Sequence, residues 1–436
     1  MDTNLLLALD RQHAWHPFTP LREWLDPDSR PEPPVLVSGR GALLRDSRGH
    51  EYIDGNSSIW TNLHGHNHPR LNAAITAQLE RFAHVSFLGA THPLAIELAR
   101  ELVGLCPGGD LTRVFYSDDG STAIESALRM ARQFHQHQGA PARRVFIAFD
   151  RAYHGDTLGA AGLGGIPIFH DAMKQGGEPF EVIRVSNVEE LFALDPVRAE
   201  TVAAAVIEPL IQGAAGMRLW LAGTLRRLRE WCDAHGVLLI ADEVMTGFGR
   251  TGTMFACEQE NVTPDFLCLA KGLTAGYLPL AATLTTERVF ETFRGGPGER
   301  RAFYYGHSYT ANALGCAVAL ESLRIFRDEN VLENLRLKIA RMATLLHERI
   351  APLPAIREVR QCGFIAGIEL HSDPAGRLLG REVCNAARRH GLLTRPIGDV
   401  VVLMPPYCIT DAQLESAVDA IREGIVDAAP GSQPTR

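Results

Sequence analysis

Four short apolar segments in the middle of the chain constrain its fold most, because none of them alternates between apolar and polar residues. They are Arg144–Phe149, Val202–Glu208, Val237–Asp242 and Phe266–Ala270. Such runs are typical of strands covered on both faces, as in a parallel sheet. Helical patterns share this part of the chain, at Pro69–Ala83, Pro93–Val103 and Ser121–Gln138. We therefore expect an α/β fold.

Composition narrows the class of protein. Of 436 residues, 46% are hydrophobic and 22% charged, with a net charge of -8, which suits a globular protein and argues against a general nucleic-acid binder. No run of about 18 apolar residues predicts a membrane span, and the N-terminal MDTNLLLALDRQHAWHP indicates a helix start rather than a signal peptide. Eight cysteines without C-x-x-C spacing favour free thiols and a cytoplasmic location.

The pattern changes after about Asn312, where a long helical stretch to His347 precedes strand-like GFIAGIEL, a further helix and the strand VVVLMPP. We expect a smaller α+β unit there, with the N-terminal 60 or so residues packing onto it. The proposed parts are an N-terminal segment (1–65), a large domain (66–318) and a small domain (319–436). PDSRPEPP at 27–34 is expected to be a loop, and the tail from 428 to fray.

The apolar run before Asp242 and Glu243 leads into GFGRTG, which fits the pattern G-x-G-x-x-G. As a dinucleotide site the match is weak, because the loop begins five residues after the run and no strongly helical segment follows Gly252. A glycine-rich loop is favoured, and a nicotinamide-dependent dehydrogenase is kept as the alternative of a different class. A metal site is weak too, since adjacent strand residues point to opposite faces.

A second apolar strand ends at Lys271, 29 residues after Asp242. A lone lysine at a strand end is usually exposed. However, ligands of open α/β sheets collect at the carboxyl ends of strands, so the acid and the lysine can face one crevice. A desolvated lysine there has a lowered pKa and can form a Schiff base.

A phosphate anchor is indicated where the strand VFYS turns into a helix at Gly120 and Ser121, because free helix amides attract anions. The alternative is a simple N-cap by Ser117, Asp118 or Ser121. Tyr153, in YHGDT after the strand VFIAFD, either stacks on a flat ring or belongs to the core. An anchor, a ring stacker, an acid for a pyridinium nitrogen and a Schiff-base lysine together suit pyridoxal 5'-phosphate.

Six motifs in order resemble the class III aminotransferases of fold type I over nearly the whole chain. They are SDDGSTAIESALRMAR, YHGDT, IEPLIQGAAGM, LLIADEVMTGFGRTG, CLAKGLTAGYLPLAATL and GHSYTANALGCAVALESL. The resemblance implies a mainly parallel seven-stranded sheet in the large domain and a homodimer with shared active sites. It assigns the roles as follows: Lys271 is catalytic and carries the Schiff base, Asp242 binds the pyridine nitrogen, Tyr153 stacks on the ring, Gly120 and Ser121 bind the phosphate, and Ser308 of the partner subunit completes that site.

Further segments resemble the 7,8-diaminononanoate synthases of biotin biosynthesis: WHPFT (15–19), DGNSSIW (54–60), HGHNHP (64–69), TRP (394–396) and MPPY (404–407). By this resemblance Arg395 holds the carboxylate of 8-amino-7-oxononanoate, and Trp60 and Tyr153 line the pocket for its apolar chain. Trp60 as ordinary core is the alternative. Ala214 stands where many ω-aminotransferases carry a glutamate that masks the arginine.

Four positions bear on the identity of the amino donor. Synthases that use S-adenosylmethionine typically have Tyr, Trp, Pro and Tyr where this chain has Phe18, Ile59, His307 and Val402. The same replacements resemble the lysine-using variety. Phe18, His307 and Gly306 are expected to line the substrate pocket, with S-adenosylmethionine as the family default and L-lysine as its rival. Other aminotransferases of this fold (for diamines or β-amino acids), an aminomutase and a regulatory domain that retains the cofactor are further alternatives.

The cluster HGHNH places His64, His66 and His68 in alternation. A zinc site would need a fourth ligand and ordered partners for these side chains. Pro69 follows at once, and the resemblance accounts for the segment without a metal. No metal is expected.

Overall fold

A seven-stranded sheet forms the centre of the larger unit in the computed structural model, which describes residues 2–26, 31–174, 180–374 and 376–428. The strand order is β4-β12-β11-β10-β7-β5-β6, and only β12 runs against the others. The strands are β4 (Leu111–Ser117), β5 (Val145–Phe149), β6 (Val182–Val185), β7 (Val202–Ile207), β10 (Leu238–Asp242), β11 (Phe266–Leu269) and β12 (Ala281–Thr286). The four apolar segments are therefore strands of one mainly parallel sheet, which confirms the predicted fold class.

The sheet is buried on both faces, which explains why its strands do not alternate in polarity. On β10, Leu239 and Ala241 belong to one core cluster, whereas Leu238 and Ile240 belong to a second one. Helix α6 (Gly120–His137) packs on the second face and contacts β4, β7, β10, β11 and β12. The other expected helices are α4 (Pro69–Leu79) and α5 (Pro93–Leu105), and both pack against α13 (Ala313–Asp328).

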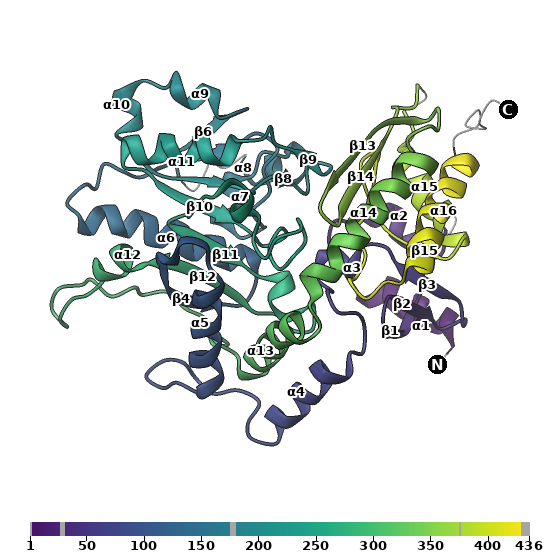
Figure 1. Cartoon of the computed structure of the whole chain (residues 1–436), viewed down its shortest axis with the longest axis horizontal. Helices are drawn as coiled ribbons and strands as arrows, with labels where there is room; N and C mark the ends of the chain where they lie inside the picture. The colour runs from purple at the N-terminus through teal and green to yellow at the C-terminus, as the bar shows by residue number, and fades with distance from the viewer. Residues whose placement is uncertain (1, 27–30, 175–179, 375, 429–436) are drawn as a thin grey trace.

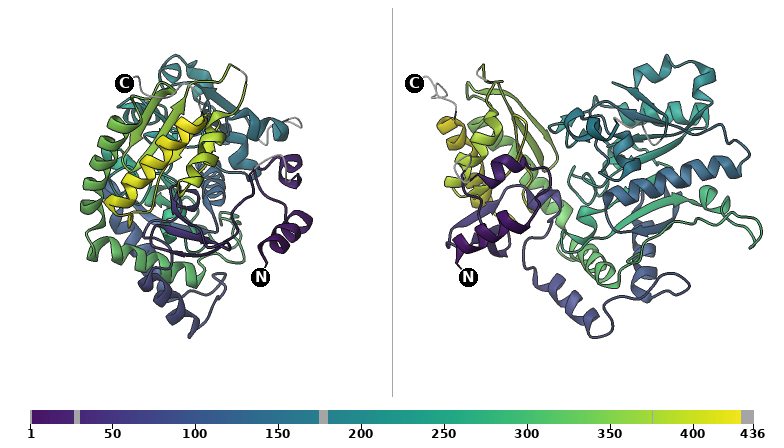
Figure 2. Two further views of the ribbon diagram at one scale, coloured as in Figure 1. Left: turned by 90° about the vertical axis from the view of Figure 1, so that its right-hand side faces the viewer. Right: turned by 180° about the vertical axis from the view of Figure 1, so that it is seen from behind.

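A smaller unit combines both ends of the chain, as Figures 1 and 2 show. Strands β1 (Leu36–Arg40), β2 (Leu43–Asp46) and β3 (Glu51–Asp54) form a sheet with β15 (Leu392–Leu393). A second sheet has the order β13-β14-β17-β16, with bounds Ile356–Cys362, Ile365–Leu370, Val400–Leu403 and Pro396–Ile397. The parallel pairing of β3 with β15 supports the proposed packing of the N-terminal segment with the small domain.

The long helical stretch predicted after Asn312 is two helices, α13 and α14 (Val331–Arg349). Asn330 separates them with φ 46°, a left-handed conformation that Asn adopts more readily than most residues. The sequence did not predict this break. Residues 27–30 of the predicted loop and 429–436 of the predicted tail lie outside the described part of the chain.

The remaining elements are short or peripheral. They are α1 (Thr3–His13), α2 (Leu21–Leu25), α3 (Ser57–Trp60), α7 (Leu158–Leu163), α8 (Pro167–Lys174), α9 (Glu189–Phe192), α10 (Pro196–Ala199), β8 (Ile211–Gln212), β9 (Arg218–Leu219), α11 (Thr224–His235), α12 (Glu287–Glu291), α15 (Leu379–Arg389), α16 (Asp411–Ala428) and the 3-10 turns η1 (Pro107–Gly109), η2 (Ala256–Glu260) and η3 (Lys271–Thr274). Across the described residues, no helix is long and apolar enough to cross a membrane.

Candidate active site

Asp242 and Lys271 meet at one edge of the large sheet. Asp242 ends β10 and pairs in parallel with Cys268 of β11, so Lys271 leaves the neighbouring strand on the same side. Burial lowers the pKa of the Lys271 ammonium, while the nearby Asp242 and Glu208 carboxylates oppose that shift. The arrangement provides an amine that loses its proton more readily than an exposed lysine.

The adjacent Glu243 has a structural role on the other face of β10. Its carboxylate accepts hydrogen bonds from the N–H groups of Ala256 and Cys257 at 2.9 and 2.8 Å and from the Thr246 hydroxyl at 2.8 Å. These contacts anchor the GFGRTG loop, whose residues 247–251 are buried. Because this loop presents little surface to a dinucleotide, the structure argues against the dehydrogenase alternative.

His154 joins the site, although the sequence analysis assigned it no role. Its Nδ1 lies 2.7 Å from Asp242 Oδ2, and the side chain is fully buried. Burial lowers the pKa of the His154 imidazole, but the Asp242 carboxylate outweighs burial and the pKa is raised overall. His154 thus orients the acid and supports its negative charge. Its position directly after Tyr153 in YHGDT was the available signal.

Glu208 is a second residue that the sequence analysis missed. It follows β7, the neighbour of β10, and accepts hydrogen bonds from Gly213 N at 3.0 Å and Tyr153 N at 3.3 Å. Burial raises the pKa of the Glu208 carboxyl to about 7. The rule that selected Asp242, an acid at the carboxyl end of a buried strand, applies to Glu208 as well.

The start of α6 forms a cradle against the YHGDT turn. The Asp119 side chain caps the helix by accepting from Thr122 N at 2.9 Å, which leaves the first-turn amides of Gly120 and Ser121 outside this capping box. Ser121 Oγ accepts from Asp156 N at 3.1 Å. A Cβ added at Gly155 would lie 2.0 Å from Ser121 Oγ, so only glycine allows this approach. The predicted helix start is confirmed, and the cap is Asp119.

Tyr153 adjoins this cradle, because its hydroxyl donates a hydrogen bond to Asp156 at 2.7 Å. Its ring contacts Phe169 edge-on at 6.1 Å between centroids, and Phe169 contacts Phe18 at 5.3 Å. Phe18 is itself exposed and has φ 50°. The structure therefore places Phe18 one ring away from Tyr153.

Trp60 covers the lysine. The Lys271 Nζ lies 4.7 Å from the centroid of the Trp60 ring. Trp60 also packs against an apolar cluster that includes Met245 and the buried Val402. The half-buried ring thus borders both the reactive amine and apolar surface, and its surroundings fit the pocket wall that the resemblance implies.

Arg395 follows β15 and is an exposed residue, and it forms no ion pair with the described residues. Gly306 and Ser308 are exposed, and His307 Nδ1 lies 3.0 Å from Asp118 Oδ2 in the same chain, beside the start of α6. The contribution of Ser308 of the partner subunit stays a prediction.

The three histidines of HGHNH have separate surroundings. His64 Nε2 lies 2.9 Å from the Ser322 hydroxyl, and burial lowers the pKa of His64 to about 3. His66 pairs with Asp54 at 2.9 Å, and the backbone N–H of His68 donates a hydrogen bond to the Tyr277 hydroxyl. Within the described part of the chain, no group of three or more His, Cys, Asp or Glu side chains is arranged to hold a metal.

The site fits a flat, phosphorylated pyridine. Buried polar atoms of Ser117 (Oγ), His154 (Nε2) and Thr157 (Oγ1) have no hydrogen-bond partner among the described residues. The start of α6, which the YHGDT turn approaches closely at Gly155, supplies amides for an anion. Asp242 and Lys271 lie at the ends of neighbouring strands.

Comparison with known proteins agrees with this geometry. Residues 26–425 match the family Aminotransferase class-III. A relative from Nitratidesulfovibrio vulgaris, named adenosylmethionine-8-amino-7-oxononanoate aminotransferase, is 46% identical over 97% of this chain and 82% of its own length. The crystal structure of the protein of that name from Methanocaldococcus jannaschii matches with a TM-score of 0.94 and 39% identity, covering 98% of this chain and 100% of that one. An amine transaminase from an uncultivated Pseudomonas species, solved with PLP bound, matches with a TM-score of 0.89 and 32% identity over 96% of this chain and 99% of its own. The chain therefore belongs to the class III aminotransferases, which use pyridoxal 5'-phosphate.

Proposed function

We propose that this enzyme transfers an amino group to 8-amino-7-oxononanoate and releases 7,8-diaminononanoate, a step of biotin synthesis, with S-adenosylmethionine as the donor. The observation that carries the acceptor is the near-full-length similarity to two proteins named for this substrate. The exposed Arg395, free of an acidic partner within the described residues, supports a carboxylate-bearing substrate.

Four groups of this chain would hold the cofactor, two backbone amides and two side chains. The amides of Gly120 and Ser121 at the start of α6 would bind its phosphate, and the Tyr153 ring would stack on the pyridine. The Asp242 carboxylate, oriented by His154 at 2.7 Å, would keep the ring nitrogen protonated. When bound, the protonated ring accepts the electron pair left on carbon after loss of a proton.

Lys271 then acts as the general base and acid. Because burial lowers the pKa of its ammonium, the free amine would take a proton from the α-carbon of the donor and hold it for return during transfer of the amino group, while the bound cofactor would supply the electron sink. With the keto substrate the same amine would deliver a proton to the carbon that receives the amino group. Trp60, 4.7 Å from Nζ, covers this proton path.

The substrate pocket lies between Trp60 and the surroundings of Arg395. Arg395 would bind the carboxylate of the acceptor through two parallel hydrogen bonds. The donor would contact Phe18, Gly306 and His307. L-Lysine is the rival donor, because Phe18 lacks a hydroxyl and the buried Val402 lacks an aromatic ring.

The assembly is proposed to be a homodimer in which Ser308 of the partner subunit completes the phosphate site. Exposure of Ser308 and Gly306 in the single chain supports this. The eight cysteines are free thiols, which supports a cytoplasmic location.

A half-reaction experiment tests the function. The holoenzyme is mixed separately with S-adenosylmethionine and with L-lysine, and loss of visible absorbance identifies the donor. Added 8-amino-7-oxononanoate should restore the absorbance and yield diaminononanoate by mass spectrometry. Lys271→Ala should abolish turnover. Failure of the keto acid to restore absorbance after either donor would refute the proposed acceptor.

A further inference from the structure

The segment that carries Trp60 has an unusual backbone. All four residues of α3 have positive φ: 45° at Ser57, 61° at Ser58, 143° at Ile59 and 65° at Trp60. None of them is glycine, and β-branched or bulky residues rarely adopt such angles. A run of this kind persists only where surrounding contacts determine it.

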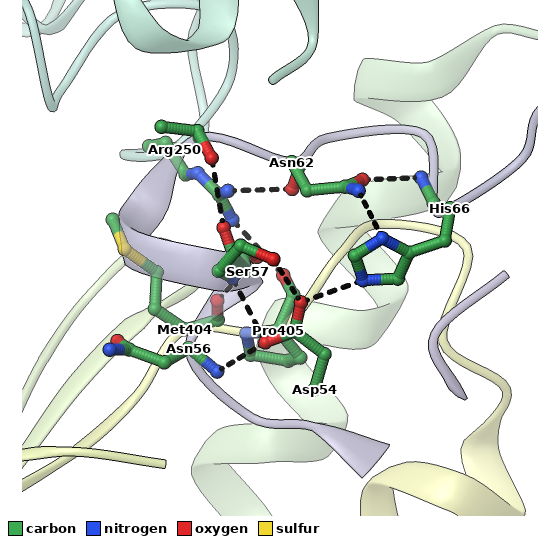
Figure 3. Close-up of polar contacts among 11 residues, drawn as sticks. Asp54, Asn56, Ser57, Asn62, His66, Arg250, Met404 and Pro405 are labelled. Atoms are coloured by element: carbon green, nitrogen blue, oxygen red, sulfur yellow. Dashed lines mark hydrogen bonds and ion pairs between the residues drawn. The ribbon is translucent and has the colours of Figure 1, made fainter. Parts of the chain in front are cut away.

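Asp54, at the end of β3, supplies several of those contacts. Its Oδ1 accepts hydrogen bonds from Asn56 N at 3.3 Å and Ser58 N at 2.9 Å. Its Oδ2 accepts from the Ser58 hydroxyl at 3.0 Å and pairs with His66 Nε2 at 2.9 Å (Figure 3). The carboxylate is 2% exposed, so water does not replace these bonds.

The tautomer of His66 is fixed by its neighbours. Gly65 N donates to Asn62 Oδ1 at 2.8 Å, so the amide nitrogen of Asn62 faces His66 Nδ1 at 3.2 Å. His66 Nδ1 must therefore accept, and Nε2 carries the hydrogen that is donated to Asp54. The His66 ring therefore requires a hydrogen-bond acceptor at Nε2, and the Asp54 carboxylate is that acceptor.

The same segment is tied to both other parts of the chain. Arg250, from the GFGRTG loop, donates to Asn62 O at 2.9 Å and to Pro405 O at 3.0 Å. The Ser57 hydroxyl donates to Met404 O at 2.6 Å. Figure 3 shows these contacts converging on the short turn that Asp54 caps.

The turn also fixes the indole that covers the reactive amine. Trp60 Nε1 donates to Asn56 Oδ1 at 2.9 Å, and Asn56 N is one of the groups bound by Asp54. Just before it, Gly55 N donates to Leu393 O at 2.9 Å, two residues from Arg395. This short segment therefore fixes the position of the Trp60 indole, and it is also bonded to β15, the strand that precedes Arg395.

We propose that Asp54, through its bonds to Ser58, Asn56 and His66, is a positioning residue that holds Trp60 over Lys271 and in register with Arg395, and so sets the affinity for the keto substrate. The inference rests on the proposed function for the identity of that substrate. Asp54 touches no reacting atom and acts through Trp60.

The test compares Asp54→Asn with Asp46→Asn. Asp46 lies in the same small sheet, is 5% exposed, and accepts from Arg48 N, His50 N and the Tyr52 hydroxyl, but no described contact joins it to α3. Asp54→Asn should raise KM for 8-amino-7-oxononanoate about tenfold, the order expected for one lost pocket contact, with kcat within about twofold. Asp46→Asn should leave KM unchanged. An equal rise in both variants would overturn the proposal.

A double-mutant cycle separates positioning from general damage. If Asp54 acts through the indole, Asp54→Asn should add nothing to the KM increase caused by Trp60→Leu. If the KM of the double variant instead rose by the product of the two single increases, the proposal would be overturned. Should Asp54→Asn fail to fold by circular dichroism, Ser58→Ala removes a single bond to the carboxylate. It should raise KM less, and only while Trp60 is present; a rise of the same size in the Trp60→Leu background would contradict the inference.

A readout independent of the keto acid keeps the two proposals apart. The face of an indole attracts a positive charge on the nearby nitrogen, so Trp60→Leu should lower by about half a unit the pH at which the visible band of the holoenzyme titrates. Asp54→Asn should lower it too, and Asp46→Asn should not. If this pattern appears while the keto acid is not a substrate, the proposed acceptor fails and the positioning role stands. An unmoved band in Asp54→Asn would overturn the role itself.

Discussion

Replacing Glu208 with glutamine should flatten the pH dependence of stability. Burial raises the pKa of this carboxyl from 4.5 to about 7. Between those values the unfolded chain ionises at Glu208 while the folded protein keeps the proton, so the free energy of unfolding falls as pH rises. At 1.36 kcal/mol per unit, the interval corresponds to about 3 kcal/mol. Below pH 4.5 the carboxyl is protonated in both states and has no such effect.

The assay is urea denaturation of the cofactor-free protein and of Glu208→Gln at several pH values from 4.5 to 8. The variant should gain about 3 kcal/mol relative to the native protein across this range, on top of a constant cost from its altered hydrogen bonds. Asp46→Asn is the control. Burial acts to raise the pKa of Asp46, but bonds from Tyr52 and His50 outweigh it and the pKa is lowered, so its stabilisation is constant above pH 4.5. Parallel curves for the native protein and Glu208→Gln would refute the reasoning.

The remaining predictions separate the neighbours of the site. Asp242→Asn should slow transamination per folded molecule about a hundredfold or more, whereas Glu243→Gln should cost about 2–3 kcal/mol of stability in thermal melts and leave the rate per folded molecule nearly unchanged. Gly155→Ala, whose Cβ would lie 2.0 Å from Ser121 Oγ, should raise the Kd for pyridoxal 5'-phosphate about tenfold or more, measured by titration of the apoenzyme. Arg395→Ala should raise KM for the keto acid about 10- to 100-fold; an unchanged KM would refute its carboxylate role.

The sheet and the edge that holds Asp242 and Lys271 were predictable because strands buried on both faces lack polar alternation. The polar residue that follows each apolar segment therefore also indicates where its strand ends. Glu208 also ends a buried strand, but its role depends on which strands lie side by side in the sheet. β7 pairs with β10, and no local sequence pattern predicts that pairing. His154 could not be selected over Tyr153 because its bond to Asp242 spans 88 residues.

The left-handed run in α3 has no local sequence signal at all. Its residues are Ser57, Ser58, Ile59 and Trp60, and none favours positive φ as glycine or asparagine does. The Met404 carbonyl binds the Ser57 hydroxyl, while His66 and Arg250 bind the flanking residues Asp54 and Asn62. These partners lie far apart in the chain. Such a conformation is selected by tertiary contacts, so propensity and periodicity do not reveal it.

Asp54 and Asp242 show how topology divides one local pattern into two roles. Each ends a strand, β3 and β10 respectively, and each pairs with a histidine. Asp242 lies at the carboxyl edge of a parallel sheet, where its histidine partner keeps one ring nitrogen unpaired among the described residues and Lys271 stands on the next strand. One oxygen of Asp242 also accepts from Val244 N at 3.1 Å, but Asp54 accepts three bonds from the turn beside it, from Asn56 N, Ser58 N and the Ser58 hydroxyl. Asp54, whose oxygens bind the turn beside it and His66, is equipped to fix geometry, whereas Asp242, at the carboxyl edge of a parallel sheet with Lys271 after the next strand, is equipped to bind a ligand.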